Sequence, residues 1–303
     1  MKGELSCIGL SKVFSNGKEA LTSVDMKVPT KGIFSLIGRN GAGKTTLTRI
    51  LSTVLEPSSG HAIIDDLDVM DDAPALRERM AIVPQEGRPI HWLTPKQYIS
   101  SYLMWRGYDY KESRRKAEEA IGRIGLTEYA DTLNRNLSGG MKRKVSVAMV
   151  VASECDFIFL DEPSTGLDPI SRRELWDLIV SESRDRFLFL TTHYLEEAEY
   201  IADRIGVLNE GRLISIGDMD HLRNNNGYSY CITVKERTDL PEIDGEVTIR
   251  KDGWIKVMTT EEEAMTISKG LIERKAHFSM NPVTLDDIFS SIINNENGDL
   301  NEG

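Results

Sequence analysis

The chain has 303 residues, of which 40% are hydrophobic and 28% charged, so it is long enough for a substantial core and is expected to form one large and one small domain. Its formal net charge of -11 argues against a general DNA- or RNA-coating protein, which needs a basic surface. The three cysteines lie far apart in the sequence, which argues against a disulfide framework or a cysteine metal site and fits a reducing cytosol.

The N-terminal part of the chain has the order strand, loop, helix, strand. Two strands are expected between Leu5 and Val28, separated by the turn-like segment SNGKEA. The segment GIFSLIG predicts a buried strand that leads directly into a glycine loop, and TTLTRILSTVL has the apolar spacing of a helix. The segment HAIID predicts another edge strand.

The glycine loop GRNGAGKT, residues Gly38–Thr45, matches the phosphate-binding pattern G-x-x-x-x-G-K-[ST] between a predicted strand and a predicted helix. Its glycines allow backbone N–H groups to surround phosphates, and Lys44 is expected to reach the β- and γ-phosphates of a nucleotide. The Thr45 hydroxyl is expected to bind Mg²⁺. The candidate nucleotide-binding residues of this segment are Gly38, Asn40, Gly41, Ala42, Gly43, Lys44, Thr45 and Thr46.

A second glycine pair lies in the segment LNRNLSGGMKRKV, immediately before another predicted helix. Ser138, Gly139 and Gly140 offer a hydroxyl, backbone N–H groups and a helix N-terminus with about half a positive charge, all of which favour an anion. Because the segment has no lysine in the position of Lys44, it is poorly built to hold a triphosphate alone. It predicts a clamp for the γ-phosphate of a nucleotide that is bound elsewhere.

The segment FIFLDE predicts a buried strand that ends in two carboxylates, Asp161 and Glu162. Ligands of α/β proteins bind at the carboxyl ends of the strands, where these acids are expected. Asp161 is expected to hold the hydration shell of Mg²⁺, and Glu162 to orient and polarise the attacking water. Without the glycine loop, two acids that simply end a strand would be the preferred interpretation; with it, they predict a site of nucleotide hydrolysis.

The remaining segments complete an α/β pattern with a small C-terminal domain. Helical periodicity and many charges predict a helical insertion at about residues 86–137. After residue 160, helices and strands alternate as far as a hairpin at RIGVLNEGRLISIG, which predicts a mainly parallel sheet with helices on both faces. NNNG, at residues 224–227, is a predicted hinge, so domains are expected at 1–224 and 225–295, the second of them α+β, with a disordered tail at 296–303.

No segment is expected to cross a membrane or to act as a signal peptide. The N-terminal sequence MKGELSCIGL lacks a sustained apolar run. The most apolar stretch, Val145–Leu160, is interrupted by Glu154 and Asp156 and is too short to span a bilayer. We therefore expect a soluble chain whose membrane role, if any, depends on a partner.

In their order and spacing these motifs resemble the ATP-binding subunit of an ABC transporter, and the resemblance runs from about Glu4 to Leu222. It implies a P-loop ABC ATPase core with an N-terminal antiparallel β subdomain and a helical insertion. LSGGM at Leu137–Met141 resembles the family signature, and STGLD at Ser164–Asp168 resembles its dimer-interface loop. The implied cofactors are ATP and Mg²⁺.

The resemblance also assigns roles to residues that carry no signal alone. Gln85, in VPQEG, lies where the family has the glutamine that contacts Mg²⁺ and the attacking water. His193, in TTHYLEEAE, lies at the position of the switch histidine, and Phe14 at that of the aromatic residue that stacks on adenine. The expected catalytic residues are therefore Glu162, His193 and Gln85, and the expected metal-binding residues are Thr45, Gln85 and Asp161.

Two kinds of partner follow from the resemblance. Two chains would meet head to tail, so that each ATP lies between Gly38–Thr45 of one chain and Ser138–Gly140 of the other; a homodimer is the simpler expectation, and a heterodimer stays open. ATP should favour this closed dimer, and hydrolysis should let the halves part. The helical insertion, linked to the γ-phosphate through Gln85, is where the family docks a separate polytopic membrane permease.

Finer features resemble one subgroup of the family. Met141, EPSTGLDP and PVTLDDIF resemble exporters whose membrane subunit is a separate type-two permease for drugs, lipids, polysaccharides or ions. Arg143 and Lys144 stand where glutamine and arginine are frequent in the family. We therefore expect a cytoplasmic protein, peripheral on the inner face of the cell membrane, with no nucleic-acid partner.

Other classes remain as alternatives. A soluble ABC-type regulatory ATPase could act on ribosomes or nucleic acid, but such proteins usually resemble two fused ABC units or carry a long coiled-coil insertion, whereas this chain has one copy of each motif. A P-loop GTPase would need an N-K-x-D motif, which the sequence lacks. The C-terminal domain stays open between a ligand-binding module, a second dimer contact and a stabilising appendage, and the transported substrate and direction are open as well.

Overall fold

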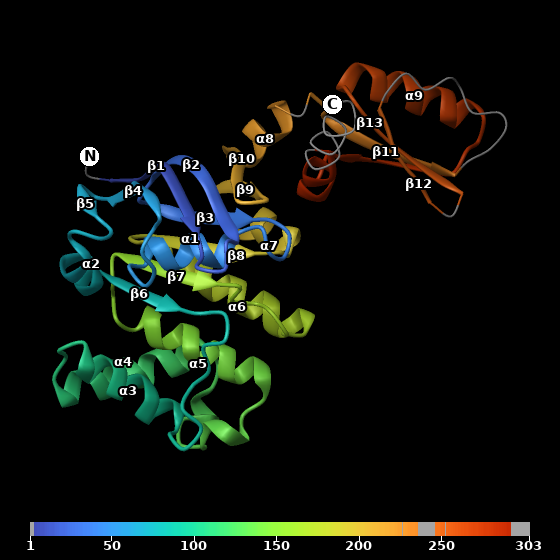
Figure 1. The fold of residues 1–303 in the computed structure, drawn as a ribbon. Helices are drawn as coiled ribbons and strands as arrows, with labels where there is room; N and C mark the ends of the chain where they lie inside the picture. Colours follow the sequence, from blue (N-terminus) through green and yellow to red (C-terminus); the bar gives the residue numbers. More distant parts are fainter. Residues whose placement is uncertain (1–2, 226, 236–245, 252, 292–303) are drawn as a thin grey trace. The chain divides into compact units, whose positions relative to one another are not determined.

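The structure of the chain, a computed structural model, describes residues 3–225, 227–235, 246–251 and 253–291. It divides into two compact units, Met1–Ile216 and Gly217–Gly303 (Figure 1). Helix α8 (Met219–Asn225) belongs to the second unit, so Asn224 and Asn225 of the expected hinge are helical. The domain boundaries expected from the sequence stay a prediction, and the expected tail at 296–303 lies outside the described residues.

The first unit is built around a six-stranded sheet in the order β10-β9-β3-β8-β7-β6. The neighbouring strands from β9 to β6 run parallel, which confirms the mainly parallel sheet predicted from the sequence. The strands are β3 (Gly32–Ile37), β6 (Met80–Val83), β7 (Phe157–Asp161), β8 (Phe187–Thr192), β9 (Arg204–Asn209) and β10 (Arg212–Gly217). Ile37 pairs with Thr192 and Asp161 with Thr191, so β3, β7 and β8 end at the same edge of the sheet.

Strands β7 and β8 are apolar at nearly every position because both faces of the sheet are covered. Phe157 and Phe159 face one hydrophobic core, while Ile158 and Leu160 of the same strand face the other. The first core also contains apolar residues of α1 (Lys44–Leu51) and of the antiparallel sheet. The second contains apolar residues of the helices on the opposite side.

The antiparallel sheet of the first unit has the order β2-β1-β4-β5. Its strands are β1 (Glu4–Val13), β2 (Glu19–Pro29), β4 (Ser59–Ile64) and β5 (Leu67–Asp68). The expectation that HAIID forms an edge strand is wrong, because β5 pairs with β4 and takes the edge position. The chain reverses between them at Asp65 and Asp66, whose positive φ values of 51° and 70° permit this tight turn.

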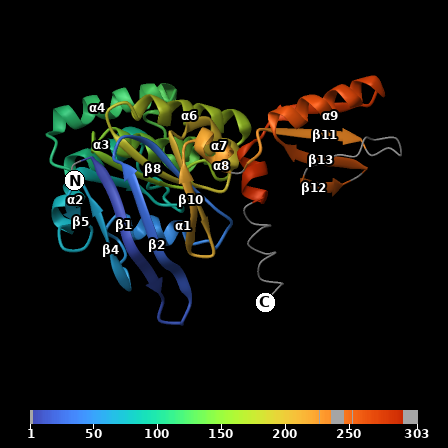
Figure 2. The ribbon, with the colours of Figure 1, turned by 90° about the horizontal axis from the view of Figure 1, so that it is seen from above.

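The helices complete the first unit, and Figure 2 shows α4 and α6 on the side away from β1, β2 and β4. The remaining helices are α2 (Ala73–Arg79), α3 (Pro95–Trp105), α4 (Tyr110–Arg123), α5 (Gly139–Val151), α6 (Pro169–Glu182) and α7 (Leu195–Ile201), with short 3-10 turns at Thr127–Tyr129 and Asn134–Asn136. The expected helical insertion is present as α3 and α4, which pack on each other and on α5. Thr94 and Asp109 cap the first turns of α3 and α4 with side-chain oxygens.

The second unit contains an antiparallel sheet in the order β12-β13-β11-β14. Its elements are β11 (Tyr230–Lys235), β12 (Glu246–Lys251), β13 (Trp254–Thr259), α9 (Glu261–Glu273), β14 (Phe278–Pro282) and a helical segment at 285–291. Ala264, Ile267 and Leu271 of α9 pack on the apolar face of the sheet. The α+β character predicted for this region is therefore confirmed, although strand β14 was not anticipated.

Replacing Phe189 by alanine should lower the free energy of unfolding by about 3–5 kcal/mol, as for other large buried side chains. The Phe189 ring is fully buried in β8 and packs against the rings of Phe34 and Phe159, with centroids 5.3 and 5.6 Å away. Urea unfolding followed by circular dichroism measures the change. Val180→Ala, at a 41% exposed position of α6, is the control and should change stability by less than about 0.5 kcal/mol. Equal effects of the two substitutions would contradict this packing.

Candidate nucleotide site

The phosphate loop connects β3 to α1 at the edge where the parallel strands end. Gly43 precedes α1 with a φ of +107°, and a Cβ there would lie 2.4 Å from the carbonyl oxygen of Ala20. A Cβ on Gly38 would lie 2.3 Å from the carbonyl oxygen of Leu208. Both positions therefore require glycine, because any side chain would collide with a neighbouring backbone carbonyl. The close approach brings the loop to the N-terminus of α1, where an anion is favoured.

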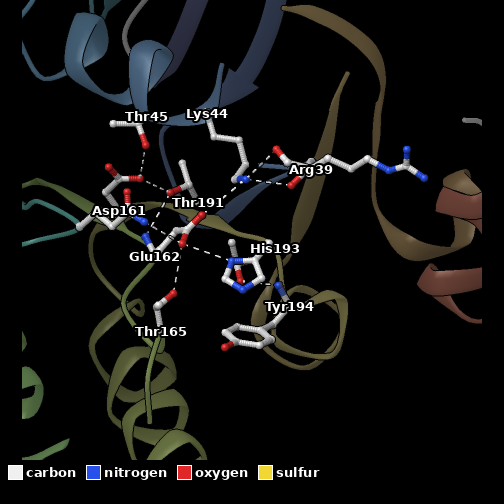
Figure 3. Close-up of polar contacts among 12 residues, drawn as sticks. Arg39, Lys44, Thr45, Asp161, Glu162, Thr165, Thr191, His193 and Tyr194 are labelled. Atoms are coloured by element: carbon white, nitrogen blue, oxygen red, sulfur yellow. Dashed lines mark hydrogen bonds and ion pairs between the residues drawn. The ribbon is translucent and has the colours of Figure 1, made fainter. Parts of the chain in front are cut away.

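Lys44 is the first residue of α1, is 4% exposed and directs its ammonium into the loop (Figure 3). Its Nζ donates to the carbonyl oxygens of Gly38 at 2.8 Å and Arg39 at 3.2 Å, and lies 3.5 Å from Glu162 Oε1. Burial lowers the pKa of Lys44, while the carboxylates of Glu162 and Asp161 oppose this shift. The loop therefore surrounds a buried cation, which an anionic phosphate would stabilise.

Asp161 ends β7 beside the phosphate loop. Its Oδ1 accepts hydrogen bonds from Thr45 Oγ1 at 3.2 Å and Thr191 Oγ1 at 2.6 Å. The hydroxyl of Thr45 and the carboxylate of Asp161 are hard oxygen ligands of the kind that Mg²⁺ prefers. Among the described residues, no three His, Cys, Asp or Glu side chains gather around a metal position. The donor set thus fits a Mg²⁺ ion that is held largely by phosphates and water rather than enclosed by the protein.

Glu162 is 6% exposed and is held by side chains from three different loops. Its Oε2 accepts hydrogen bonds from Gln85 Nε2 and from Thr165 Oγ1, both at 3.1 Å. His193 Nδ1 lies 3.2 Å from the same oxygen, without the alignment of a hydrogen bond. Lys44 therefore lies beside Oε1 of the carboxylate and His193 beside Oε2 (Figure 3), and Gln85 donates to the same Oε2.

The backbone of Glu162 is strained. Its φ is +49°, a left-handed conformation that costs a non-glycine residue about 1–2 kcal/mol. The N–H of Glu162 donates to the carbonyl oxygen of Thr191 at 3.0 Å and to its Oγ1 at 3.1 Å. Strain of this kind persists where neighbouring groups fix the backbone, and it is concentrated at functional sites.

One cavity of about 240 Å³ brings together most of the residues that the sequence assigned to the nucleotide. It is lined by Phe14, Lys18, Ala20, Asn40, Gly41, Gly43, Lys44, Thr45, Thr46, Gln85 and Glu162. Gly38 and Ala42 belong to the same loop but are not among the lining residues. Asp161 and His193 contact lining residues, through Thr45 and Glu162.

The signature residues lie elsewhere in the first unit, at the start of α5. Ser138 caps this helix, and its Oγ accepts a hydrogen bond from the N–H of Met141 at 3.2 Å. A Cβ on Gly140 would meet the Ser171 side chain of α6 at 3.3 Å. None of Ser138, Gly139 and Gly140 is among the residues that line the cavity.

Sequence reasoning missed several residues that support the site. The hydroxyls of Thr165 and Thr191 contact Glu162 and Asp161, but a threonine in a turn or near the end of a strand gives no specific signal. Arg143 and Glu197 are buried charges on helices α5 and α7, at 8% and 0% exposure. The helical periodicity could have revealed them, because it places both charged residues on the side of the helix that faces the core. In an amphipathic helix that side normally carries apolar residues.

Glu197 is a fully buried carboxylic acid on α7 that bonds a side chain of α6. It accepts a hydrogen bond from Trp176 Nε1 at 2.8 Å. Burial raises the pKa of Glu197, although the neighbouring side chains of Thr192, Ser164, Trp176 and Arg172 oppose the shift. Ser164 begins the STGLD loop, and Thr192 precedes His193.

The family model and the curated relatives that match this chain point to the same family. Residues 21–165 match the family model described as ABC transporter. The chain is 36% identical to the daunorubicin/doxorubicin resistance ATP-binding protein DrrA of Streptomyces peucetius, over 72% of this chain and 66% of that protein. It is 33% identical to the phospholipid-transporting ATPase ABCA3 of Rattus norvegicus, over 77% of this chain but only 14% of that protein. The chain thus spans less than two thirds of these curated relatives.

Solved structures agree with the fold. The structure of an ATP-binding subunit of an ABC transporter matches with a TM-score of 0.65 and 26% identity, over 74% of this chain and 93% of that chain. CbiO1 of Clostridium perfringens, part of an ABC transporter complex, matches with a TM-score of 0.64 and 27% identity, over 73% and 94% of the two chains. These similarities confirm the α/β fold predicted from the sequence.

Glu197 should make stability depend on pH. The pKa of Glu197 is higher in the folded chain than in the unfolded chain. At acidic pH the carboxyl is protonated in both states. As the pH rises, the unfolded chain loses this proton first, which favours unfolding. The wild type should therefore lose stability relative to Glu197→Gln as the pH rises above about 4, the pKa of a glutamate in the unfolded chain. Urea unfolding of both proteins across this range measures the difference. A difference that does not vary with pH would contradict the buried carboxyl.

Proposed function

This chain belongs to the ABC transporter family through its ATP-binding domain, and on that premise we propose that it hydrolyses ATP to drive a separate membrane permease, in an exporter. The observation that carries the proposal is the single cavity that contains Lys44, Thr45, Gln85 and Glu162 at the carboxyl ends of the parallel strands. A cation for phosphate, a hydroxyl for Mg²⁺ and a carboxylate for water are the groups that phosphoryl transfer requires.

The substrate is MgATP, and the residues of the site have separate roles in binding or hydrolysing it. Lys44 and the backbone of the loop bind the β- and γ-phosphates, and Phe14 offers its ring to the adenine. Thr45, Asp161 and Gln85 would hold Mg²⁺, which would supply neutralisation of the charge on the phosphates. Glu162 orients and polarises the attacking water, and His193 stabilises the γ-phosphate beside it. Binding of the phosphates replaces Glu162 as the anionic partner of Lys44 and frees the carboxylate for water.

The signature residues support a dimer. Ser138–Gly140 form an anion-favouring helix start that does not line this chain's own cavity. We therefore place them against the γ-phosphate of the ATP that a second copy of the chain binds. In return, the signature of that second copy lies against the ATP in this chain's cavity, which Phe14 and Thr46 line. ATP bridges both halves and favours the closed state; hydrolysis removes the bridge.

Transport is inferred from the relatives, because the names of DrrA and ABCA3 refer to drug resistance and phospholipid transport. No described helix is long and apolar enough to cross a membrane. We further propose that a separate polytopic permease docks on the α3–α4 insertion and holds the chain on the inner face of the cell membrane. These relatives favour a transporter over the alternative of a regulatory ATPase that acts on ribosomes or nucleic acid.

Glu162→Gln should reduce ATP turnover by at least about 100-fold, the scale of a general base or water-positioning group, while ATP binding persists. Lys44→Ala is the contrasting variant and should weaken ATP binding itself, because the buried ammonium is lost from the loop. Equilibrium nucleotide binding and steady-state ATPase assays on both variants separate the two roles. Turnover near the wild-type rate in Glu162→Gln would show that another group activates the water.

Purification of the tagged chain from gently solubilised native membranes should recover a polytopic membrane protein in matching amounts. The tag alone, expressed in the same cells, is the control for non-specific recovery. Identification by mass spectrometry and quantification of the two proteins measure the outcome. Recovery of ribosomal or DNA-bound proteins instead, with the chain absent from membranes, would refute the transporter role.

A further inference from the structure

We propose that Arg143 is a positioning residue that locks the Gln85 loop and the Glu162 loop into one geometry and ties both to the signature helix. The inference deepens the proposed function and rests on it. Arg143 does not itself line the cavity, but it bonds the backbone carbonyls of two residues that do, Gln85 and Glu162. Its role would be to hold the two groups that align the attacking water and to couple them to the start of α5.

Six backbone carbonyl oxygens of two loops accept from the five N–H groups of the Arg143 guanidinium, so at least one N–H of Nη1 is shared. From the segment that follows β6, the carbonyls of Pro84, Gln85 and Gly87 accept from Nη1 at 3.1, 3.2 and 3.4 Å. From the segment that ends β7, those of Asp161 and Glu162 accept from Nη2 at 2.8 and 2.9 Å, and that of Pro163 accepts from Nε at 2.8 Å. The two segments are therefore held by one rigid planar group.

The chemistry of the site needs arginine. A planar guanidinium presents five N–H donors in a fixed fork, whereas a lysine ammonium has three donors on a flexible stem and cannot hold two loops at a set separation. Arg143 is 8% exposed, and burial lowers its pKa against the opposing effect of Asp161, Glu197 and Glu162. Keeping a guanidinium in such a place is unfavourable unless its donors are satisfied, and the six carbonyls satisfy them.

The hydrogen bond from Arg143 to the carbonyl oxygen of Glu162 holds a residue whose backbone is strained. With a φ of +49°, Glu162 is fixed on its N–H side by Thr191 and on its carbonyl side by Arg143. Without Arg143, one of these two restraints is lost, and the backbone can relax from the left-handed conformation. That relaxation would move the carboxylate away from Gln85 and from the position of the attacking water.

Arg143 also connects the two nucleotides of the proposed dimer. It lies in the second turn of α5, and Ser138 caps the first turn of the same helix. Ser138 would contact the nucleotide bound by the partner, while Gln85 and Glu162 would act on the nucleotide bound by this chain. Closure of the partner onto the signature is therefore transmitted, through one helix and one guanidinium, to the hydrolytic groups of this chain.

The test uses the full-length chain with Arg143→Lys, Arg143→Gln and the control Arg115→Gln. Arg115 is an exposed arginine on α4 that pairs with Glu119 at 2.7 Å, so the control removes an arginine without touching either loop. For each protein, kcat and KM for MgATP, equilibrium ADP binding, the thermal midpoint and amide hydrogen exchange are measured. The exchange of peptides covering 84–88 and 161–165 is compared with that of 38–46.

In both Arg143 variants, kcat should fall by at least about tenfold, the scale expected when reacting groups are slightly misplaced. ADP affinity should stay unchanged within error, because Arg143 makes no contact with the phosphate loop. Exchange should become faster in 84–88 and 161–165 but not in 38–46, and Arg115→Gln should match the wild type throughout.

Two results would overturn the positioning role. One is wild-type kcat in both Arg143 variants. The other is a parallel loss of kcat, ADP affinity and thermal midpoint with uniformly faster exchange, which would assign Arg143 to folding alone. Absence of ATPase activity in the wild type with its permease would refute the proposed function instead, and the exchange pattern of the nucleotide-free variants would still decide the role of Arg143.

Discussion

The buried charges at the carboxyl ends of β3 and β7 constrain the rest of the nucleotide site. Lys44 and Glu162 are almost completely buried and lie 3.5 Å apart, so each limits the desolvation cost of the other. Loss of one partner of such a pair is expected to cost about 3–5 kcal/mol, because the remaining charge is left without compensation. A polyphosphate can replace Glu162 as the partner of Lys44 without leaving the ammonium unpaired. Binding of the substrate and release of the carboxylate are then one exchange of ion-pair partners.

The sequence predicted the parts of the molecule whose signal is local. The glycine loop, the apolar strand before Asp161 and Glu162, and the glycine pair after Ser138 were each found at the junction expected for them, because their chemistry depends on neighbouring residues in the chain. The roles assigned to individual site residues stay predictions, although the cavity groups most of them. Helix α1 was expected to continue to Leu55 but ends at Leu51, since Thr53 adopts a φ of +61°.

What the sequence could not supply are contacts between distant segments. Arg143 was noted only as an unusual residue after the signature, and its carbonyl partners lie 18 to 59 residues away. Thr191 supports Asp161 and Glu162 from a neighbouring strand, across a pairing that no local pattern specifies. The edge strand β5 was missed because two residues are too short to show a period. In each case the fold, rather than the segment, creates the interaction.

Thiol cross-linking shows whether two copies of the chain share each ATP. One preparation carries Asn40→Cys and another carries Ser138→Cys. Because the native cysteines Cys7, Cys155 and Cys231 are buried, a short bifunctional thiol reagent should react with the introduced cysteines. Both preparations carry Glu162→Gln to slow hydrolysis. After mixing, MgATP should produce a cross-linked dimer that neither preparation forms alone, and MgADP should not. If MgATP gave no cross-link between the mixed chains while both still bound the nucleotide, each ATP would be held by one chain rather than shared by two.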